Sequence, residues 1–175
     1  MKNKTIWITG LSGSGKSTLA KKMAQRLTED QQKILLLDGD TLRKIFNVDN
    51  NDSNYTLEAR LNLARKYSCL CKEITDQGFN VIISTISLFS EIHKWNRKNL
   101  KDYFEIYLKV TIDEVKKRDP KKIYENFTKG KSKNVVGLDL KFDVPENPDL
   151  IIENFNIDYP VDDIIKNIIN KRKLK

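Results

Sequence analysis

The chain has 175 residues, 39% of them hydrophobic and 32% charged, a composition typical of one folded domain rather than a disordered chain. Its apolar runs are too short to span a bilayer or to form a signal peptide, so we expect a cytoplasmic protein without a membrane partner. The net charge of +8 permits either nucleic acid or a polyanionic small molecule as partner. Because no basic cluster is interleaved with aromatic residues, we favour the small molecule and expect no nucleic acid.

The apolar pattern predicts strands and helices that alternate along the chain. The strands are expected at residues 4–9, 34–37, 79–86, 103–110 and 150–152. The helices are expected at residues 16–27, 41–46, 56–76, 91–100, 112–118 and 161–171. Gly78 is expected to end the third helix and Thr111 to cap the fifth. The polar residues 47–54 are expected to form a surface loop.

The predicted strands are continuously apolar rather than alternating, which is typical of a parallel sheet covered on both faces. We therefore predict a single α/β domain over residues 1–175, in which a parallel five-stranded sheet carries helices on both faces. The strand at residues 34–37 is expected to be buried like the others.

Several conspicuous residues are expected to have structural rather than catalytic roles. Cys69 and Cys71 lie two residues apart in a predicted helix, where they cannot easily form a disulfide, so we expect reduced thiols. His93 is expected on the surface of its helix. Trp7 and Trp95 are expected to be packing residues.

Residues 10–17 match the phosphate-binding loop G-x-x-x-x-G-K-[ST], here called the P-loop. A strand is predicted before the loop and a helix after it, which disfavours a chance glycine-rich turn and predicts the three-layer P-loop NTPase fold. Lys16 is expected to reach the β- and γ-phosphates of ATP, and the Ser17 hydroxyl to bind Mg²⁺. The expected ATP contacts in this segment are Gly10, Ser12, Gly13, Ser14, Gly15, Lys16, Ser17 and Thr18. The motif alone does not separate kinases from GTPases or ATPases.

Two carboxylates, Asp38 and Asp40, follow the second predicted strand, at the edge of the sheet where ligands gather. We interpret Asp40 as a general base and Asp38 as a support for the metal, directly or through water. The alternative is that Asp40 only caps the helix that begins near Thr41. Arg43 lies one turn beyond Asp40 and could bind an anion of the acceptor, or could be a solvated surface arginine.

In combination, these segments resemble the adenylylsulfate (APS) kinase family. The resemblance is carried by residues 10–19, 37–43, 118–124, 137–139 and 144–150, in the order of the family's motifs. It implies transfer of the γ-phosphate of MgATP to the 3′-hydroxyl of a nucleotide whose 5′ end carries a mixed anhydride. It also implies a lid over ATP at about residues 119–137, with Arg118 and Lys121 in contact with ATP. Members are commonly dimers, so we expect a homodimer.

The chain departs from the family pattern on the side of the acceptor. In the family, two aromatic rings sandwich the acceptor's adenine, whereas this chain has Tyr55 at one of these positions and Val135 at the other. Arg60 matches the motif arginine, but Ala59 and Leu63 replace its aspartate and asparagine. The expected acceptor contacts are Asp40, Arg43, Tyr55, Arg60, Ile86, Ser87 and Val135.

An intact ATP half beside an altered acceptor half favours the family's reaction on a different nucleotide. A related branch phosphorylates cytidine diphosphoramidate during capsule phosphoramidate synthesis, and we favour that acceptor over APS, which remains the alternative. Two rivals stay open: a P-loop nucleotide sensor or RNA-binding module, and another small-molecule kinase of the gluconate or shikimate type. The second rival lacks the Pro-Glu-Asn-Pro-Asp-Leu run found here at residues 145–150.

Overall fold

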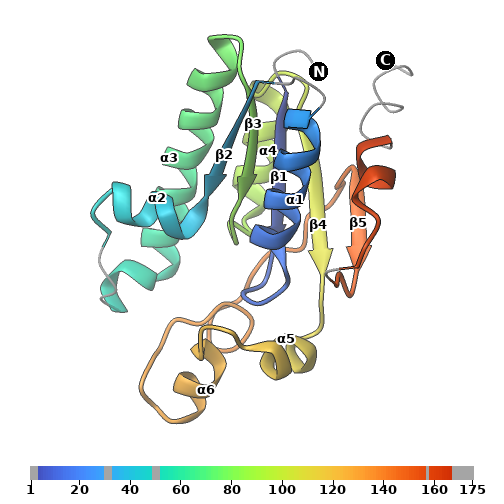
Figure 1. Ribbon diagram of the computed structural model, residues 1–175. Helices are drawn as coiled ribbons and strands as arrows, with labels where there is room; N and C mark the ends of the chain where they lie inside the picture. Colours follow the sequence, from blue (N-terminus) through green and yellow to red (C-terminus); the bar gives the residue numbers. More distant parts are fainter. Residues whose placement is uncertain (1–3, 30–32, 49–51, 157, 167–175) are drawn as a thin grey trace.

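A parallel sheet of five strands forms the centre of the computed structural model (Figure 1). The structure describes residues 4–29, 33–48, 52–156 and 158–166. The strands, in chain order, are β1 (Thr5–Gly10), β2 (Ile34–Asp38), β3 (Asn80–Ser84), β4 (Phe104–Lys109) and β5 (Leu150–Glu153). Their spatial order is β2-β3-β1-β4-β5, and every neighbouring pair is parallel. The predicted fold class is therefore confirmed.

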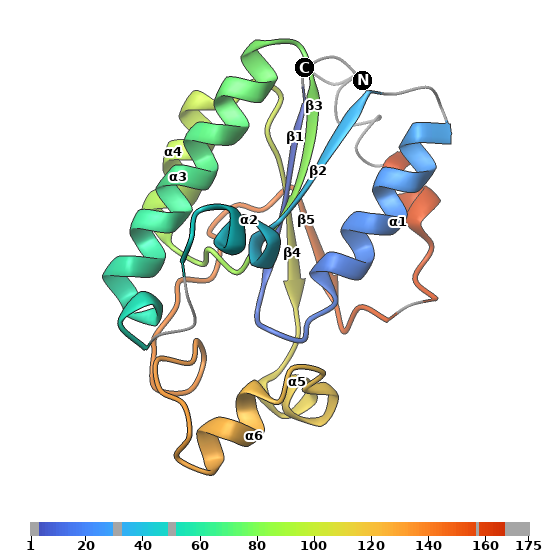
Figure 2. The ribbon, with the colours of Figure 1, turned by 60° about the vertical axis from the view of Figure 1, so that its left-hand side comes forward.

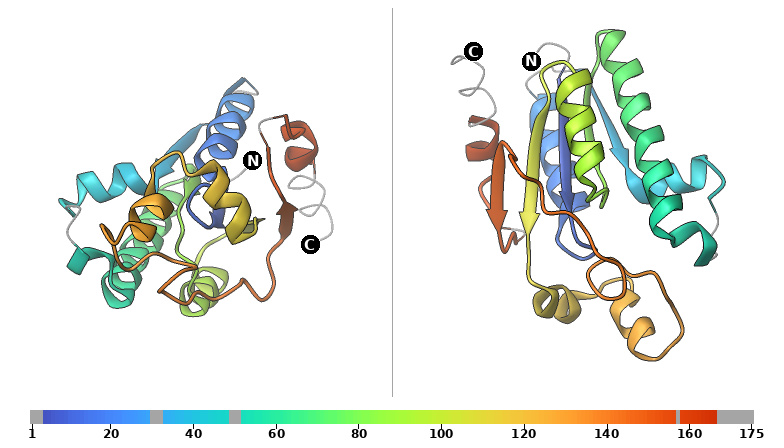
Figure 3. Two further views of the ribbon diagram at one scale, coloured as in Figure 1. Left: turned by 90° about the horizontal axis from the view of Figure 1, so that it is seen from below. Right: turned by 180° about the vertical axis from the view of Figure 1, so that it is seen from behind.

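Helices cover both faces of this sheet (Figure 2). They are α1 (Lys16–Glu29), α2 (Gly39–Ile45), α3 (Leu57–Asp76), α4 (Ser90–Asn99), α5 (Ile112–Arg118) and α6 (Ile123–Thr128), with a 3₁₀ helix, η1, at Asp52–Tyr55. Helix α1 lies on one face, and α3 and α4 lie on the other (Figures 1 and 3). Residues 161–166 are helical, and the expected continuation to residue 171 lies outside the described residues.

The ends of two helices are set by the residues that the sequence indicates. The Thr111 hydroxyl accepts a hydrogen bond from the backbone N–H of Glu114 at 3.3 Å, which caps α5. Gly78 follows α3 with a φ of +96°, the left-handed conformation that ends a helix most easily with glycine. The start of α3 is capped in the same way as that of α5, by the hydroxyl of Thr56.

The side chains of β1 alternate between two hydrophobic clusters, one on each face of the sheet. Ile6 and Ile8 pack with Leu19 of α1. Trp7 points to the opposite face, where it is fully buried among side chains of α3 and α4. Trp7 is thus a packing residue, as expected, and the two clusters hold the loop that follows β1 in a fixed place.

The strand predicted at residues 34–37 is not buried, which corrects the sequence-based expectation. It forms β2 at the edge of the sheet, where it pairs with β3 alone. Leu35 and Leu36 retain 41% and 38% of their exposure. A central and an edge strand of a parallel sheet can have the same apolar sequence, because the apolar run does not specify how many neighbours the strand has.

The predicted loop at residues 119–137 contains a short helix, α6, that the apolar pattern does not reveal. It has six residues, and Tyr124 is its one buried side chain. The Asp119 carboxylate fixes its first turn by accepting the backbone N–H groups of Ile123 and Glu125, at 2.8 and 2.9 Å. A helix of fewer than two turns, stabilised by one aspartate, is too short to leave a periodic signal in the sequence.

The expectation that His93 lies on the surface is wrong. Its side chain is buried in α4, and its Nδ1 pairs with the carboxylate of Glu105 on β4. Of the two thiols, Cys71 is buried and Cys69 exposed, and both are free, as expected. Among the described helices, none combines the length and the apolar composition that crossing a membrane requires.

The P-loop, the aspartates and the lid meet at the carboxyl ends of the strands, at the lower end of the sheet in Figure 1, whereas the motif residues 144–150 lead into the start of β5. The P-loop follows β1, Asp38 ends β2 and Asp40 lies in the first turn of α2 just after it, and α5 and α6 follow β4 below the sheet. The fold therefore gathers the predicted phosphate loop, carboxylates and lid around one space.

Candidate active site

The P-loop turns tightly between β1 and α1 because glycines occupy positions where a side chain cannot fit. Gly15 has a φ of +95°, and a Cβ there would lie 2.5 Å from Cδ1 of Phe155. Gly10 lies so close to β4 that a Cβ would be 2.7 Å from the carbonyl oxygen of Leu108. Lys16 is the first residue of α1, so the loop ends at the positive end of the helix dipole.

The ammonium group of Lys16 is held inside this loop, where its Nζ donates a hydrogen bond to the carbonyl oxygen of Leu11 at 2.6 Å. Burial, followed by the nearby charge of Lys121, lowers the pKa of Lys16 to about 7. The carboxylates of Asp40 and Asp38 oppose this shift without cancelling it. An anion placed in the loop would restore the full charge of Lys16, so the site favours a ligand with negative charge.

Asp38 connects the P-loop to two neighbouring strands. Its Oδ2 accepts hydrogen bonds from the hydroxyls of Ser17 at 2.6 Å and Ser84 at 2.9 Å. Burial alone would raise the pKa of Asp38, but the hydrogen bonds from Ser17 and Ser84 lower it below its usual value. The backbone N–H groups of Asp40 and Thr41 contribute to the same effect. The carboxylate is thus ionised at neutral pH and lies beside a hydroxyl.

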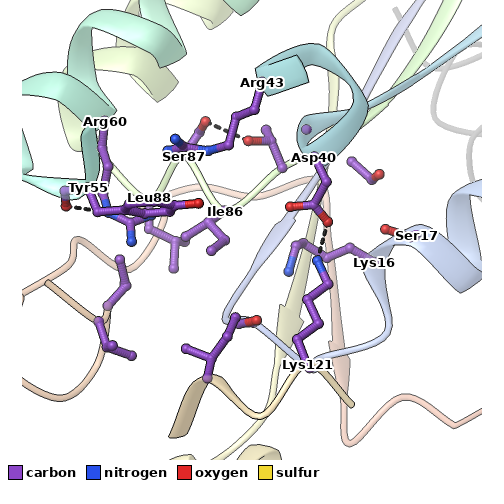
Figure 4. Close-up of a pocket in the computed structure, with 18 of the residues that line it drawn as sticks. Lys16, Ser17, Asp40, Arg43, Tyr55, Arg60, Ile86, Ser87, Leu88 and Lys121 are labelled. Carbon is purple, nitrogen blue, oxygen red and sulfur yellow. Dashed lines mark hydrogen bonds and ion pairs between the residues drawn. The ribbon is translucent and has the colours of Figure 1, made fainter. Parts of the chain in front are cut away.

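The same contacts exclude one of the two interpretations of Asp40, namely that it caps α2. The residue that caps α2 is Asp38, whose side chain accepts from the first backbone amides of the helix. Asp40 is free of that task, and its carboxylate forms an ion pair with Lys121 of the lid (Figure 4). Asp40 and Lys121 keep 60% and 52% of their side-chain exposure, so the pair faces an open space.

Three predicted acceptor residues form a compact group beside Asp40, in which the ring of Tyr55 contacts two arginines. The guanidinium carbon of Arg43 lies 4.4 Å from the ring centroid, and that of Arg60 lies 4.9 Å away. Arg43 comes from α2 and Arg60 from α3, so Tyr55 joins two elements (Figure 4). Burial and the charge of Arg43 lower the pKa of Arg60 to about 10, which leaves it cationic at neutral pH.

Arg60 also holds the backbone on both sides of this group. Its Nε donates to the carbonyl oxygen of Tyr55 at 2.8 Å, and its Nη2 donates to that of Asn134 at 2.9 Å. Arg43 donates from Nη1 to the carbonyl oxygen of Asn54 at 3.4 Å. Neither arginine is a solvated surface residue, because each is ordered by backbone carbonyls and by the Tyr55 ring.

The segment that follows β3 lines the cavity on the side of the predicted acceptor residues. Ile86 is fixed through its carbonyl oxygen, which accepts a hydrogen bond from the buried hydroxyl of Thr9. Ser87 has a φ of +24°, a sparsely populated conformation for a residue with a side chain, and its hydroxyl bonds to that of Thr85 at 2.9 Å. Such backbone strain is found preferentially at functional sites.

One cavity of about 1550 Å³ joins the P-loop, the aspartates, the arginines and the lid. This volume exceeds the range of roughly 300–1,000 Å³ that is usual for a site with one small ligand, so the cavity can hold two nucleotides. The predicted ATP-binding and acceptor residues line it, except for Gly10 and Ser14. These two residues are buried within the P-loop and shape its turn instead.

Several lining residues do not appear among the sequence-based candidates. Among them are Ser84, Leu88, Phe142, Phe155 and Asn156. Ser84, Phe155 and Asn156 lie at or just beyond the carboxyl ends of β3 and β5, the position that the topology of parallel sheets marks as a ligand edge. The carbonyl oxygen of Phe155 also accepts a hydrogen bond from Nη1 of Arg118 at 2.8 Å, which places the start of the lid.

Comparison with known proteins identifies the group to which this site belongs. A sequence model described as adenylylsulphate kinase matches residues 2–153. The chain belongs to the adenylylsulphate kinase family. It is 40% identical to a cytidine diphosphoramidate kinase of Campylobacter jejuni over 166 residues, which cover 93% of this chain and 95% of that protein. It is 39% identical to an adenylyl-sulfate kinase of Clostridium acetobutylicum over 155 residues, with 88% and 76% coverage.

The fold agrees with a solved member of the family. The Mycobacterium tuberculosis APS kinase in complex with AMPPNP and APS superimposes with a TM-score of 0.85 at 30% identity, over 95% of this chain and 97% of that one. The P-loop NTPase fold is thus confirmed. The chain is a kinase, a phosphotransferase that acts on a hydroxyl group, with ATP as phosphoryl donor and a small nucleotide as substrate.

Proposed function

We propose that this kinase transfers the γ-phosphoryl group of MgATP to the ribose 3′-hydroxyl of a nucleotide that carries a mixed anhydride at its 5′ end. Among such nucleotides, we propose cytidine diphosphoramidate as acceptor rather than adenylyl sulfate. The observation that supports the proposal is that Asp40 lines one cavity together with the P-loop lysine and with two arginines that contact the Tyr55 ring.

Mg²⁺ fits the residues at the start of α1 and the end of β2. The Ser17 hydroxyl and the ionised Asp38 carboxylate lie 2.6 Å apart, and oxygen donors of this kind are those that Mg²⁺ prefers. Ser17 would hold the ion directly and Asp38 directly or through water. When bound, Mg²⁺ supplies positive charge to the phosphate oxygens.

Each group of residues has a separate role in the transfer of the phosphoryl group. Lys16 and the amides of the P-loop hold the β- and γ-phosphates, while Lys121 of the lid, with Arg118, contacts ATP from the other side. Asp40 accepts the proton of the 3′-hydroxyl while the hydroxyl oxygen forms a bond to the γ-phosphorus. The bond from that phosphorus to the β–γ bridging oxygen breaks, and ADP leaves. Positioning and charge stabilisation supply most of the catalysis in such a reaction.

The acceptor's anhydride is proposed to lie against Arg43 and Arg60, and its base toward Ile86, Ser87 and Val135. Val135 is 5% exposed and aliphatic, where the family pattern has a second aromatic ring. The ring of Tyr55 already contacts both guanidinium groups. Stacking contributes about 1–3 kcal/mol per base, so a site with this composition loses part of the advantage of a large purine. A smaller pyrimidine fits a slot with one aliphatic wall.

The test is a coupled ADP-release assay with cytidine diphosphoramidate and adenylyl sulfate measured side by side. We expect a higher kcat/KM for the cytidine compound. A higher kcat/KM for adenylyl sulfate would support the alternative, a true adenylylsulfate kinase that forms the 3′-phosphorylated product. ATP binding without acceptor-dependent ADP release would instead favour a nucleotide sensor or RNA-binding module and would refute the proposal.

Two further expectations accompany this function. We propose that the protein is a homodimer, which sedimentation at micromolar concentration would test, and a trimer or hexamer would contradict it. A solved relative from Thiobacillus denitrificans is a hexameric APS kinase, so an assembly larger than a dimer occurs in a relative. We also propose a cytoplasmic location, where ATP is available, and fractionation of cells would test it.

A further inference from the structure

Residues 134–140 form a tight loop, here called the acceptor loop, which supplies Val135 to the wall of the cavity. Within the loop, the N–H of Leu138 donates to the carbonyl oxygen of Val135 at 3.0 Å, and that of Gly137 donates to Leu140 at 2.9 Å. Val135 and Val136 are buried in a hydrophobic cluster that also contains Leu11 of the P-loop. The loop is therefore a defined wall and not a solvated connection.

The carboxylate of Asp139 organises this loop from the side of solvent. Its Oδ2 accepts the backbone N–H of Asn134 at 2.7 Å, and its Oδ1 accepts that of Val135 at 2.6 Å. Both are short charge-assisted hydrogen bonds, the stronger class of hydrogen bond. Asn134 has a φ of +60°, so the backbone turns sharply at the residue that Asp139 holds.

Arg60 binds the carbonyl group of Asn134, the residue whose N–H is bound by Asp139. Its Nη2 donates to the carbonyl oxygen of Asn134 at 2.9 Å, and its Nε donates to that of Tyr55 at 2.8 Å. The Asp139 carboxylate thus binds the N–H of Asn134, while the Arg60 guanidinium binds its carbonyl oxygen. The cation is the arginine that also contacts the Tyr55 ring.

We propose that Asp139 is a positioning residue for the acceptor. Together with Arg60, it sets the distance between Val135 and Tyr55 and thereby the width of the slot for the acceptor's base. This inference rests on the proposed function, because it assigns the base to that slot. Asp139 is exposed and does not line the cavity, so it acts through the backbone of the loop and not by contact with substrate.

The proposal predicts an effect on one substrate only. Without the carboxylate, the Asn134 and Val135 amides lose their acceptors and the loop is free to widen the slot. The ATP half depends on Lys16 and Asp38, which lie on α1 and β2 and share no hydrogen bond with the acceptor loop among those described. The Asp139→Ala variant should therefore weaken acceptor binding about tenfold, the low end of the change expected when the two charge-assisted hydrogen bonds to the loop are lost.

The experiment compares Asp139→Ala with a matched variant, Asp119→Ala. Asp119 also accepts two backbone N–H groups, but those of Ile123 and Glu125 in the lid. Calorimetric titration with CMP, AMP and MgATP, together with the melting temperature, gives the affinities of each variant. For Asp139→Ala we expect about tenfold weaker CMP binding, a CMP-to-AMP preference closer to one, and MgATP affinity within about twofold. For Asp119→Ala we expect the larger change in MgATP affinity.

Two outcomes would overturn the proposal: unchanged CMP affinity, or an equal loss of CMP and MgATP affinity together with a lower melting temperature. Asp139→Asn keeps one acceptor oxygen and should lie between the wild type and Asp139→Ala, which gives a second variant if the alanine form does not fold. Because these titrations need no turnover, a wild type that phosphorylates neither acceptor would refute the proposed function and still allow the role of Asp139 to be decided.

Discussion

Replacement of Asp40 by asparagine separates its chemical role from any structural one. The substitution keeps the size of the side chain but removes the negative charge and the capacity to accept a proton. General-base catalysis contributes about 10²–10⁴ to a rate, so kcat should fall by about that factor. MgATP is held mainly by the P-loop, so its KM should change by less than about threefold, because uniform binding is not affected.

The structural cost of this substitution is small. Asp40 loses an ion pair with Lys121 that is 60% and 52% exposed, and such pairs contribute about 0.2–1 kcal/mol. In a protein of this size, 1 kcal/mol shifts the melting temperature by about 2–4 °C. A large loss of kcat with a shift within this range would therefore report on the chemistry and not on the folding.

The assay is coupled ADP release at saturating MgATP with each acceptor, accompanied by a thermal melt. Asp113→Asn is the matched control, because Asp113 is exposed in the first turn of α5 and does not line the cavity. It should retain the wild-type kcat. Turnover of Asp40→Asn within about threefold of the wild type would refute the assignment of Asp40 as the base.

Three further predictions concern the phosphate half of the site. Lys16→Ala should abolish turnover and weaken MgATP in a calorimetric titration, and unchanged affinity would place the phosphates elsewhere. The pKa of Lys16 is lowered to about 7 in the empty site, so ATP binding at pH 8 should be accompanied by the uptake of a proton. For the same reason, the affinity for ATP should fall as the pH rises above 7. A binding heat at pH 8 that does not depend on the ionisation heat of the buffer would contradict this prediction. Gly15→Ala should cost about 1–3 kcal/mol of stability and impair ATP binding, since its Cβ would lie 2.5 Å from Phe155, and a wild-type melting temperature would show that the loop relaxes freely.

The fold could be predicted from local patterns where those patterns are long. The continuous apolar strands and the amphipathic helices predicted the parallel sheet. A hydroxyl residue, Thr111, predicted the start of α5, and a glycine, Gly78, predicted the end of α3. The place of each strand in the sheet was not predictable in this way. Leu35 and Leu36 are as apolar as central-strand residues, yet they lie on the exposed edge because β2 has one neighbour.

The phosphate half of the site was predictable because its residues are close in sequence and their spacing follows from the chemistry. The link from Asp38 to Ser17 joins two such segments, and the topology brings them together at the carboxyl ends of the strands. The capping role of Asp38 could have been assigned from its position before α2. It excludes a capping role for Asp40, and the role of Asp40 as a base stays a prediction.

Polar contacts between residues on different elements could not be predicted from the sequence. The helical pattern around His93 does not reveal that Glu105 of β4 is its partner. The hydrogen bond from Arg60 to the carbonyl oxygen of Asn134 spans 74 residues, and no local signal predicts it. Such non-local polar contacts order the predicted acceptor residues, which is why the base of the acceptor is harder to infer from the sequence than the donor.

The central claim is that the phosphoryl group moves from ATP to a ribose 3′-hydroxyl, and ³¹P NMR of the product tests it most directly. After incubation with MgATP and cytidine diphosphoramidate, we predict a new phosphomonoester signal coupled to the ribose H3′, with one ADP formed for each. The absence of a 3′-phosphomonoester with either cytidine diphosphoramidate or adenylyl sulfate, whether ATP stays intact or is hydrolysed to inorganic phosphate, would contradict the account.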